Sequence, residues 1–425
     1  MDDRPSPRTD APIRIAVAQP LVRLTSTDER GHTKMTDAVR RMASAVLRVK
    51  DVPLFGRLRQ RRAEPHSRPL AIWISTSLRT QGGVATSVMN MLGGPLRENW
   101  QLVHIASHTD GSAVQKLARF VLAVLQFLEI NGRRYVTLVH IHTASFGSFA
   151  RKSCFAWLAK RLLGIPTIMH VHGAEFDLFY DNLSPMSRAW VARTLSRVDA
   201  VIALSDRWRE TLLNRVPEAN VHVIPNAVPV PTATRRPSPG RPPVALFVGR
   251  IGHRKGTFGL IRAWARATRP HGSRLVIVGD GSVREAQQLV EAIGVSDSVD
   301  VLGWQPRTRI SDLMTASDVF VLPSLAEGQP MAILEAMAHG MAVIATSVGA
   351  IEETLAGGAA GMIVPPDDVE ALIEALSVVL GNEEVRSHLA VTARHRVIAN
   401  YSIERVSSDI DKLYRRVLTA AEANR

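Results

Sequence analysis

Short apolar runs alternate with helical stretches along most of this chain, and one proline-rich break interrupts the series. Before the break, the runs lie at residues 70–74, 102–106, 137–141, 166–171, 200–204 and 221–224. After it, they lie at 244–248, 274–278, 299–302, 319–322 and 342–345. Strands that are apolar on both faces belong to buried parallel sheets, and strand–helix alternation covers such sheets with helices. The sequence therefore predicts an α/β protein with two Rossmann-like domains in tandem.

The stretches between these runs predict helices, the clearest of them at residues 84–91, 115–129, 149–163, 187–196, 369–380, 384–397 and 403–422. The break, residues 226–243, holds six prolines and has no helical period, which is typical of a linker. We place the first domain at 69–228, the linker at 229–243 and the second domain at 244–400. Residues 401–425 are predicted to form a helix that crosses back to the first domain.

Residues 1–68 form a basic extension that we expect to be partly flexible. They hold 15 basic and 8 acidic residues, whereas the remaining 357 residues hold 37 and 31, so about half of the net charge of +13 lies here. A helix at 36–50 would have Val39, Met42 and Val46 on one side and arginines on the other. Such a helix can lie on an anionic membrane or pack against the body of the protein. A wrongly assigned start codon is a third explanation.

Composition excludes several classes of protein. Cys154 is the only cysteine among the 425 residues, so neither a disulfide framework nor a cysteine zinc cluster is expected, which suits a reducing compartment. The most apolar run, 120–128, is too short to span a bilayer. The first ten residues lack the apolar core of a signal peptide. These features predict a cytoplasmic protein, with peripheral attachment to the inner face of the plasma membrane as an option.

Two candidate sites follow strands of the first domain. Gly82 and Gly83 lie between the first strand and a helix, where a backbone can approach an anion closely, although an ordinary tight turn explains them equally well. His170 and His172 alternate on the fourth strand and point the same way. They could be a metal pair, but no cysteine or further histidine nearby completes a site. We expect His170 to be buried with its hydrogen bonds satisfied, and His172 at the strand end to be functional.

In the second domain, Gly249 ends the first strand, Arg250 follows it, and Lys255 lies near the start of the next helix. An arginine and a lysine near a helix N-terminus favour binding of a diphosphate. The segment lacks the Walker pattern GxxxxGK[ST]. Gly279 and Gly281 form a similar turn after the second strand, where geometry alone is an equally good explanation.

The most informative segment follows the strand 319–322. Glu327 lies on a loop, and Glu335 lies eight residues later in the otherwise apolar helical stretch AILEAMA. A carboxylate in such a helix is desolvated unless it has partners. Ligand hydroxyls are natural partners, since a carboxylate can accept two of them, and a buried salt bridge is the alternative for Glu335.

These motifs together resemble the family 4 glycosyltransferases, retaining enzymes of the GT-B fold, in which two Rossmann-like domains face a central cleft. The resemblance covers residues 69–425. It rests on the glutamate pair within LPSLAEGQPMAILEAMAHGMAVIAT, preceded by VGRIGHRKG, VGDGS, the glycine pair at 82–83, HG at 172–173 and IPNAV at 224–228. It implies a hexosyltransferase that uses a nucleotide sugar and builds bacterial cell-surface polysaccharide or exopolysaccharide.

The resemblance also implies roles for individual residues. Arg250, Lys255, Glu327 and His172 would be catalytic: the two basic residues on the donor diphosphate, Glu327 on the hydroxyls of the donor sugar and His172 near the reacting sugar. Glu335 would bind the ribose hydroxyls. The remaining predicted donor contacts are Gly83, Gly249, Gly279, Gly281, Gly328, Gln329, Pro330 and Met331. Two residues depart from the family pattern: Gln329 replaces a more usual aromatic or aliphatic residue, and Ala350 replaces a glycine.

No DxD-like metal motif accompanies these residues, so we expect neither a bound metal nor another cofactor. The leaving phosphate would take the acceptor proton, with a carboxylate nucleophile as the alternative. The predicted partners are a nucleotide-sugar donor, a lipid-linked or glycan acceptor and an anionic membrane surface. Nucleic acid is not expected, because no recognised binding motif is present. The alternatives are a sugar-nucleotide epimerase on the same fold and a non-enzymatic basic binding protein. The donor base and sugar, the linkage and the oligomeric state stay open.

Overall fold

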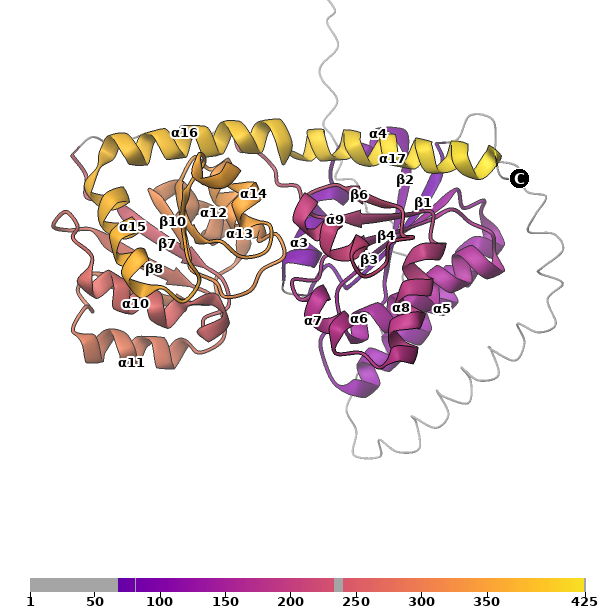
Figure 1. The fold of residues 1–425 in the computed structure, drawn as a ribbon, viewed down its shortest axis with the longest axis horizontal. Coiled ribbons are helices and arrows are strands. Elements are labelled where there is room, and N and C mark those ends of the chain that lie inside the picture. Colours follow the sequence, from indigo (N-terminus) through magenta and orange to yellow (C-terminus); the bar gives the residue numbers. More distant parts are fainter. Residues whose placement is uncertain (1–67, 81, 233–239, 424–425) are drawn as a thin grey trace, which may run out of the picture. The chain divides into compact units, whose positions relative to one another are not determined.

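The computed structural model describes residues 68–80, 82–232 and 240–423, and all of them fall within one compact unit. They form two six-stranded parallel sheets, each with helices packed against it (Figure 1). The prediction of two Rossmann-like domains is therefore confirmed. The helix expected at 36–50, and the whole extension before residue 68, lie outside the described residues.

The first sheet has the strand order β2-β1-β3-β4-β5-β6. Its strands are β1 (Leu70–Ser75), β2 (Gln101–Ala106), β3 (Leu138–Thr143), β4 (Thr167–Val171), β5 (Ala200–Ala203) and β6 (Val221–Val223). Its helices are α3 (Gly83–Leu92), α4 (Leu96–Asn99), α5 (Ala113–Arg133), α6 (Gly147–Trp157), α7 (Phe176–Asp181), α8 (Pro185–Arg197) and α9 (Asp206–Leu213). A π-helical turn, η3 (Leu158–Leu162), extends α6.

The second sheet has the order β12-β11-β10-β7-β8-β9. Its strands are β7 (Val244–Val248), β8 (Arg274–Val278), β9 (Val299–Gly303), β10 (Val319–Leu322), β11 (Ala342–Thr346) and β12 (Met362–Val364). Its helical segments are η4 (His253–Lys255), α10 (Thr257–Arg266), α11 (Val283–Ile293), α12 (Arg307–Ala316), α13 (Met331–Ala338), α14 (Ile351–Thr354), η5 (Ala356–Gly358), α15 (Val369–Gly381) and α16 (Glu383–Asn400). The last helix is α17 (Ile403–Ala423).

Every predicted strand appears within two residues of its expected ends, because most residues of these runs are apolar. The prediction missed β12, which has three residues and lies at the edge of its sheet after a glycine-rich turn. It also missed α4, α7 and α9, which are too short to show a helical period. These short elements form mainly because they pack against the rest of the domain, so the local sequence pattern does not reveal them.

The apolar stretch 120–128 belongs to the core of the first domain. Ala123 and Phe127 are fully buried, and Phe120, Val124 and Leu128 pack against the same cluster. Burial therefore accounts for most of this stretch, although Leu122 is exposed. Within the described residues, no helix is both long enough and apolar enough to cross a membrane.

The start of the proline-rich break packs against the first domain. The Ser87 hydroxyl on α3 donates to Asn226 over 2.8 Å, and the Asn90 amide donates to the carbonyl of Ala227. Val228 forms a β-bridge with Ser402, at the point where α17 begins. Residues 226–228 are therefore ordered parts of the fold, and residues 233–239 lie outside the described residues.

Helix α17, at the yellow end of the chain in Figure 1, packs on the first domain although it follows the second in sequence. Ile410, Leu413 and Tyr414 share a buried cluster with Trp73 of β1. The indole nitrogen of Trp100 donates to Asp411 over 2.7 Å, and the Tyr414 hydroxyl lies 2.6 Å from Nδ1 of His140. The C-terminal helix is thus held by both apolar and polar contacts.

Replacement of Tyr414 by phenylalanine is expected to lower the free energy of unfolding by about 1–3 kcal/mol. Tyr414 is fully buried, and the other ring nitrogen of His140 already has no partner among the described residues. The substitution would leave that imidazole without any hydrogen bond. Urea unfolding followed by far-UV circular dichroism measures the change. Thr419→Val, at the exposed end of the same helix, is the control, and an equal effect there would contradict the argument.

Candidate functional site

Arg250 and Lys255 lie on the loop between β7 and α10. Arg250 is exposed, and its guanidinium has no hydrogen-bond or ion-pair partner among the described residues. Lys255 ends the turn η4, and Gly256 follows it with φ 69°. A Cβ atom on Gly256 would lie 1.9 Å from the carbonyl oxygen of Pro323, so only glycine fits. This close approach holds the lysine against the loop that follows β10.

Lys255 and Glu327, which the sequence assigns to different parts of a ligand, pair with each other in the structure. The Lys255 ammonium donates to the Glu327 carboxylate, and the Ser324 hydroxyl donates to the same carboxylate oxygen over 2.7 Å. The two charged side chains are only 16% and 8% exposed. An ion pair this sheltered is weakly screened by solvent and fixes both groups in place. Ser324 is part of the site, although sequence reasoning gave it no role.

Glu335 lies one turn into α13 with its side chain 24% exposed. Burial raises the pKa of its carboxyl to about 7, and the nearby charge of Arg307 partly offsets that shift. The distance from Nη2 of Arg307 to Oε1 of Glu335 is 3.8 Å, which is long for a buried salt bridge. The expected desolvation of Glu335 is thus confirmed. Arg307, at the start of α12, escaped sequence reasoning because nothing local marks it as a partner of Glu335.

Gln329 was predicted to contact the donor, but its side chain is engaged within the protein. Its Oε1 accepts from the backbone amide of Asn226 over 2.7 Å, and its Nε2 donates to Thr354. Its carbonyl also accepts from the Asn226 side chain. Its side chain and its carbonyl are thus engaged within the protein, and only its backbone amide is left for the predicted role. Gln329, the residue that departs from the family pattern, therefore links the loop before α13 to the segment after β6 through its hydrogen bonds with Asn226.

The loop that precedes α13 meets two predicted segments of the first domain. A Cβ atom on Gly328 would lie 3.2 Å from the carbonyl oxygen of His172. A Cβ atom on Gly83 would lie 3.5 Å from the Met331 side chain. Helix α13 begins after Pro330 with no side-chain cap, so its first amides are open to an anion. The structure thus brings Gly83, His172 and the start of α13 together.

The glycines of the turn 279–281 have steric reasons to be glycine. Gly279 has φ 156°, and a Cβ atom there would lie 1.7 Å from the carbonyl oxygen of Gly249. A Cβ atom on Gly281 would lie 2.4 Å from the carbonyl oxygen of Ile251 and 3.1 Å from Cγ of Arg250. Close packing of the two loops therefore accounts for these residues, and that packing positions the Arg250 side chain.

The prediction that no further histidine approaches His170 and His172 is wrong. Strand β3 pairs with β4 so that His142 lies opposite His170, and His140 lies on the same face. Nδ1 of His142 is 3.0 Å from Nε2 of His172. Adjacency between strands cannot be read from the local sequence, and two more histidines of β3 therefore escaped notice.

His170 is buried as predicted, but its hydrogen bonds are not satisfied. Neither ring nitrogen has a partner within the part of the chain that the structure describes. One ring nitrogen from each of His140, His142 and His170 lies within 4.8 Å of the others. The rings of His140 and His142 are stacked, with an angle of 16° between their planes. Lone pairs in nearly parallel planes do not converge on one ion, so the cluster as arranged is not a formed metal site.

His172 is buried and uncharged at neutral pH. Burial lowers the pKa of its imidazole to about 3; the side chain of Asn226 opposes the shift and the charge of Lys152 adds to it. A neutral imidazole can donate or accept a hydrogen bond beside a ligand without placing a positive charge there.

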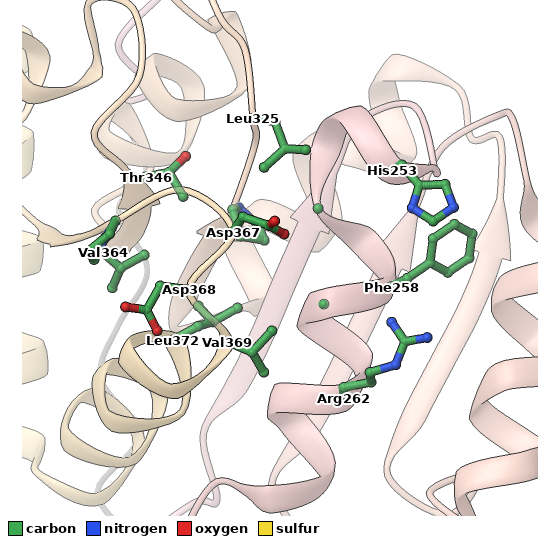
Figure 2. A pocket seen from close by; sticks show the side chains of 14 residues that line it. His253, Phe258, Arg262, Leu325, Thr346, Val364, Asp367, Asp368, Val369 and Leu372 are labelled. Carbon is green, nitrogen blue, oxygen red and sulfur yellow. The ribbon is translucent and has the colours of Figure 1, made fainter.

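A separate pocket lies on the second domain, between η4, the start of α10 and the segment that follows β12 (Figure 2). His253, Arg262 and Asp367 are among its lining residues. The described residues that line it include none of the predicted site side chains. The pocket adjoins the predicted site, because Gly256 and Pro323, which hold Lys255 in place, both line it.

Comparison with known proteins identifies the class that this fold and site define. Residues 74–230 match the family described as Glycosyltransferase Family 4, and residues 233–396 match Glycosyl transferases group 1. The chain belongs to this glycosyltransferase family, as the sequence motifs predicted. Membership disfavours the alternative of a non-enzymatic binding protein.

Curated relatives come from several bacteria. The chain is 27% identical to an alpha-D-kanosaminyltransferase from Streptomyces kanamyceticus, over 66% of this chain and 77% of that protein. It is 29% identical to an alpha-maltose-1-phosphate synthase from Mycolicibacterium smegmatis, over 68% and 81%. A third relative, from Escherichia coli, is a UDP-Gal:alpha-D-GlcNAc-diphosphoundecaprenol alpha-1,3-galactosyltransferase, 26% identical over 65% and 74%.

Solved structures share the fold. Sucrose-phosphate synthase from Thermosynechococcus elongatus superimposes with a TM-score of 0.69 at 22% identity, covering 83% of this chain and all of that one. Anabaena HepE in complex with UDP-glucose superimposes with a TM-score of 0.65 at 19% identity, covering 82% and 99%. These likenesses confirm the predicted GT-B architecture.

Proposed function

We propose that this glycosyltransferase moves a hexose from a UDP- or GDP-linked donor to an acceptor hydroxyl, with retention of configuration and without a bound metal. The main support is the grouping of Glu335, the Lys255–Glu327 pair and the open N-terminus of α13 beside Gly83 and His172. A sugar nucleotide presents hydroxyls to carboxylates and phosphates to cations and helix amides. The complex of HepE with UDP-glucose supports a nucleotide-sugar donor.

The second domain, residues 244–400, would hold the donor. Arg250 and Lys255 bind the diphosphate, Glu335 accepts hydrogen bonds from the ribose hydroxyls, and Glu327 accepts them from the sugar. Since Glu327 already accepts from Lys255 and Ser324, its orientation is set before the donor arrives. The amides around 328–331 approach the sugar and phosphate.

In the reaction, the bond between the anomeric carbon and the diphosphate oxygen breaks, and its electron pair stays on the phosphate. Positive charge develops on the sugar and negative charge on the leaving group. Arg250, Lys255 and the dipole of α13 stabilise that negative charge. The acceptor oxygen forms its bond to the anomeric carbon on the same face, and its proton passes to the leaving phosphate. Glu327 is paired with Lys255, which makes it a poor covalent nucleophile.

The first domain, residues 69–228, would bind the acceptor, which we propose to be a lipid-linked glycan in polysaccharide biosynthesis. The name of the Escherichia coli relative, which includes a diphosphoundecaprenol acceptor, supports this choice. The first domain also exposes large apolar side chains at Leu117, Phe146, Trp157 and Met186. These side chains suit a peripheral visit to a membrane, where the acceptor lipid resides. Co-sedimentation of the full chain with anionic liposomes at low salt tests the attachment, and protein that stays in the supernatant would refute it.

The decisive experiment measures release of nucleoside diphosphate from UDP- and GDP-sugars by the purified chain, with a lipid extract as acceptor source. The assay is run with and without EDTA, beside Glu335→Ala. We expect release from one donor class that resists EDTA and is lost in the variant. Inhibition by EDTA would overturn the metal-free mechanism. Failure of every donor to bind or react would overturn the donor assignment.

UDP affinity is expected to fall about tenfold between pH 8 and pH 6, because Glu335 must be a carboxylate to accept two hydroxyls and its pKa is about 7. Its pKa is higher in the folded protein than in the unfolded chain, so the proton stabilises the fold, and stability is lost as pH rises from about 4.5 through 7. Glu335→Gln should therefore weaken binding, remove this part of the pH dependence and raise stability at pH 8. Calorimetric titration with UDP and thermal unfolding measure both effects. Equal pH profiles for variant and wild type would contradict the role.

A further inference from the structure

Lys152 is a lysine in an unusual place. It lies on α6 in the first domain and is 1% exposed. Within the described residues it has no ion-pair or hydrogen-bond partner, and the only nearby charge that affects it is the like charge of Arg151. The pKa of its ammonium is lowered to about 7, mainly by burial and further by the repulsion from Arg151. A buried ammonium without a counter-charge is costly, so its retention at this position needs an explanation.

The Lys152 ammonium lies near the carboxyl ends of β2 and β4 in the first sheet. Burial is the main cause of the lowered pKa values of His104 on β2, His108 just beyond β2 and His172 just beyond β4, and the charge of Lys152 lowers each of them further. Asp110 faces His108 and is the nearby acid that opposes its shift. Ligands of parallel α/β sheets bind beyond the carboxyl ends of the strands, so Lys152 has the position of a ligand-binding group.

Other groups beside Lys152 also lack partners. Nε of Arg151 and the hydroxyl oxygen of Ser145 are buried and form no hydrogen bond within the described part of the chain. Helix α6 has no side-chain cap, and Phe146, which precedes it, adopts the strained values φ 56° and ψ −134°. A non-glycine residue in that region is costly, and such strain gathers at functional sites. Hydrogen-bond donors and positive charge are therefore collected here without an acceptor.

The cluster adjoins the predicted reaction centre. A Cβ atom on Gly173 would lie 2.5 Å from the hydroxyl oxygen of Ser145, and Gly173 directly follows His172. The donor diphosphate is assigned to Arg250 and Lys255 of the second domain, on a different element. The first domain thus presents a second set of cationic groups, on the side assigned to the acceptor.

We propose that Arg151, Lys152, Ser145 and the first turn of α6 bind a phosphate group of the acceptor. The inference rests on the proposed function, because it assumes that the first domain receives the acceptor. A phosphate carries negative charge and several acceptor oxygens, which suit an ammonium, a guanidinium, a hydroxyl and helix amides together. The phosphate belongs either to a soluble sugar phosphate or to a lipid-linked sugar phosphate.

Binding of a doubly charged anion would stabilise the protonated form of Lys152. At pH 7 the group is close to half protonated when the site is empty, so anion binding should take up a proton from solution. Sulfate is a suitable probe, because it has the charge and shape of phosphate but does not itself titrate near pH 7. A lysine that is only a packing element would show no such uptake.

The experiment titrates the full chain with sulfate by calorimetry at pH 7, in two buffers of different ionisation enthalpy, with saturating UDP to occupy the donor site. We expect wild type to bind sulfate with net proton uptake. Lys152→Met should weaken binding at least tenfold and abolish the uptake, while its melting temperature equals or exceeds that of wild type. Lys412→Met on α17, an exposed lysine, is the control and should bind sulfate as wild type does.

Equal sulfate affinity in Lys152→Met and wild type would overturn the inference, as would absence of binding or of proton uptake in wild type. UDP binding is measured in the same samples. If UDP does not bind, the proposed donor site fails, whereas a loss of sulfate binding in Lys152→Met without UDP would still support the anion site. Turnover with a soluble sugar phosphate or with a lipid extract then distinguishes the two sources. With the active one, Lys152→Met should raise the acceptor KM at least tenfold.

Discussion

Replacement of Arg250 by alanine is expected to lower donor turnover by about 10²- to 10³-fold, the usual effect of removing one preorganised group that stabilises developing charge. The guanidinium is exposed and has no partner among the described residues, so the fold does not depend on it. Close packing of Gly279 against Gly249 holds the loop that carries it. The melting temperature should therefore stay within a degree or so of the wild-type value.

Initial rates of nucleoside diphosphate release, with thermal unfolding of the same samples, test this expectation. Arg266→Ala is the matched control, because Arg266 is an exposed arginine of the same domain and its ion pair with Glu370, the one it forms with a described residue, is solvent-exposed. It should leave turnover unchanged and cost at most about 1 kcal/mol of stability. A similar loss of turnover in both variants, or an unaltered rate in Arg250→Ala, would remove Arg250 from the mechanism.

The Lys255–Glu327 pair should give the largest combined effect on stability and activity. Lys255→Met and Glu327→Gln should each lower the free energy of unfolding by about 3–5 kcal/mol, since each leaves the other group uncompensated in a sheltered position. Each should also lower turnover at least about 10³-fold, because both groups are assigned to the donor. Urea unfolding and initial rates measure the two quantities.

The double variant separates the two roles of the pair. Lys255→Met with Glu327→Gln removes both charges, and the amide oxygen of glutamine can still accept from Ser324. We expect stability to return to within about 1 kcal/mol of wild type, as replacement of a complete buried pair often does. Turnover should stay lost. The exposed pair Arg266→Met with Glu370→Gln is the control. Recovered turnover in the Lys255 and Glu327 double variant would show that the pair serves only the fold.

Some features of the site could be predicted from the sequence because they depend on local pattern. Glu335 is one: a single acid in an apolar helical stretch has to be desolvated, and the structure raises the pKa of its carboxyl to about 7. The position of Arg250 directly after an apolar strand also followed from the order of residues. Contacts between residues of neighbouring strands could not be predicted from the sequence. His142 and His170 are opposite each other only because β3 and β4 pair in that register.

The partners that individual side chains contact come from segments far apart in the chain. Gln329 contacts Asn226, 103 residues earlier, and Lys255 contacts Glu327, 72 residues later. No helical or strand period extends over such distances, so the sequence predicted ligand contacts for these groups without showing that they also bind other residues of the protein. The burial of Lys152 could not be predicted from the sequence, because a lysine in an amphipathic helix normally reaches solvent.

The sequence by itself determined the two parallel sheets, their order along the chain and the family to which the protein belongs. Those properties follow from apolar runs, glycine turns and motif spacing, all of which act over a few residues. The tertiary structure decided which charges pair, which histidines meet and which cations are left without partners. These depend on burial and on strand register, because the cost of an unpaired charge is set by the side chains and solvent around it rather than by its neighbours in sequence.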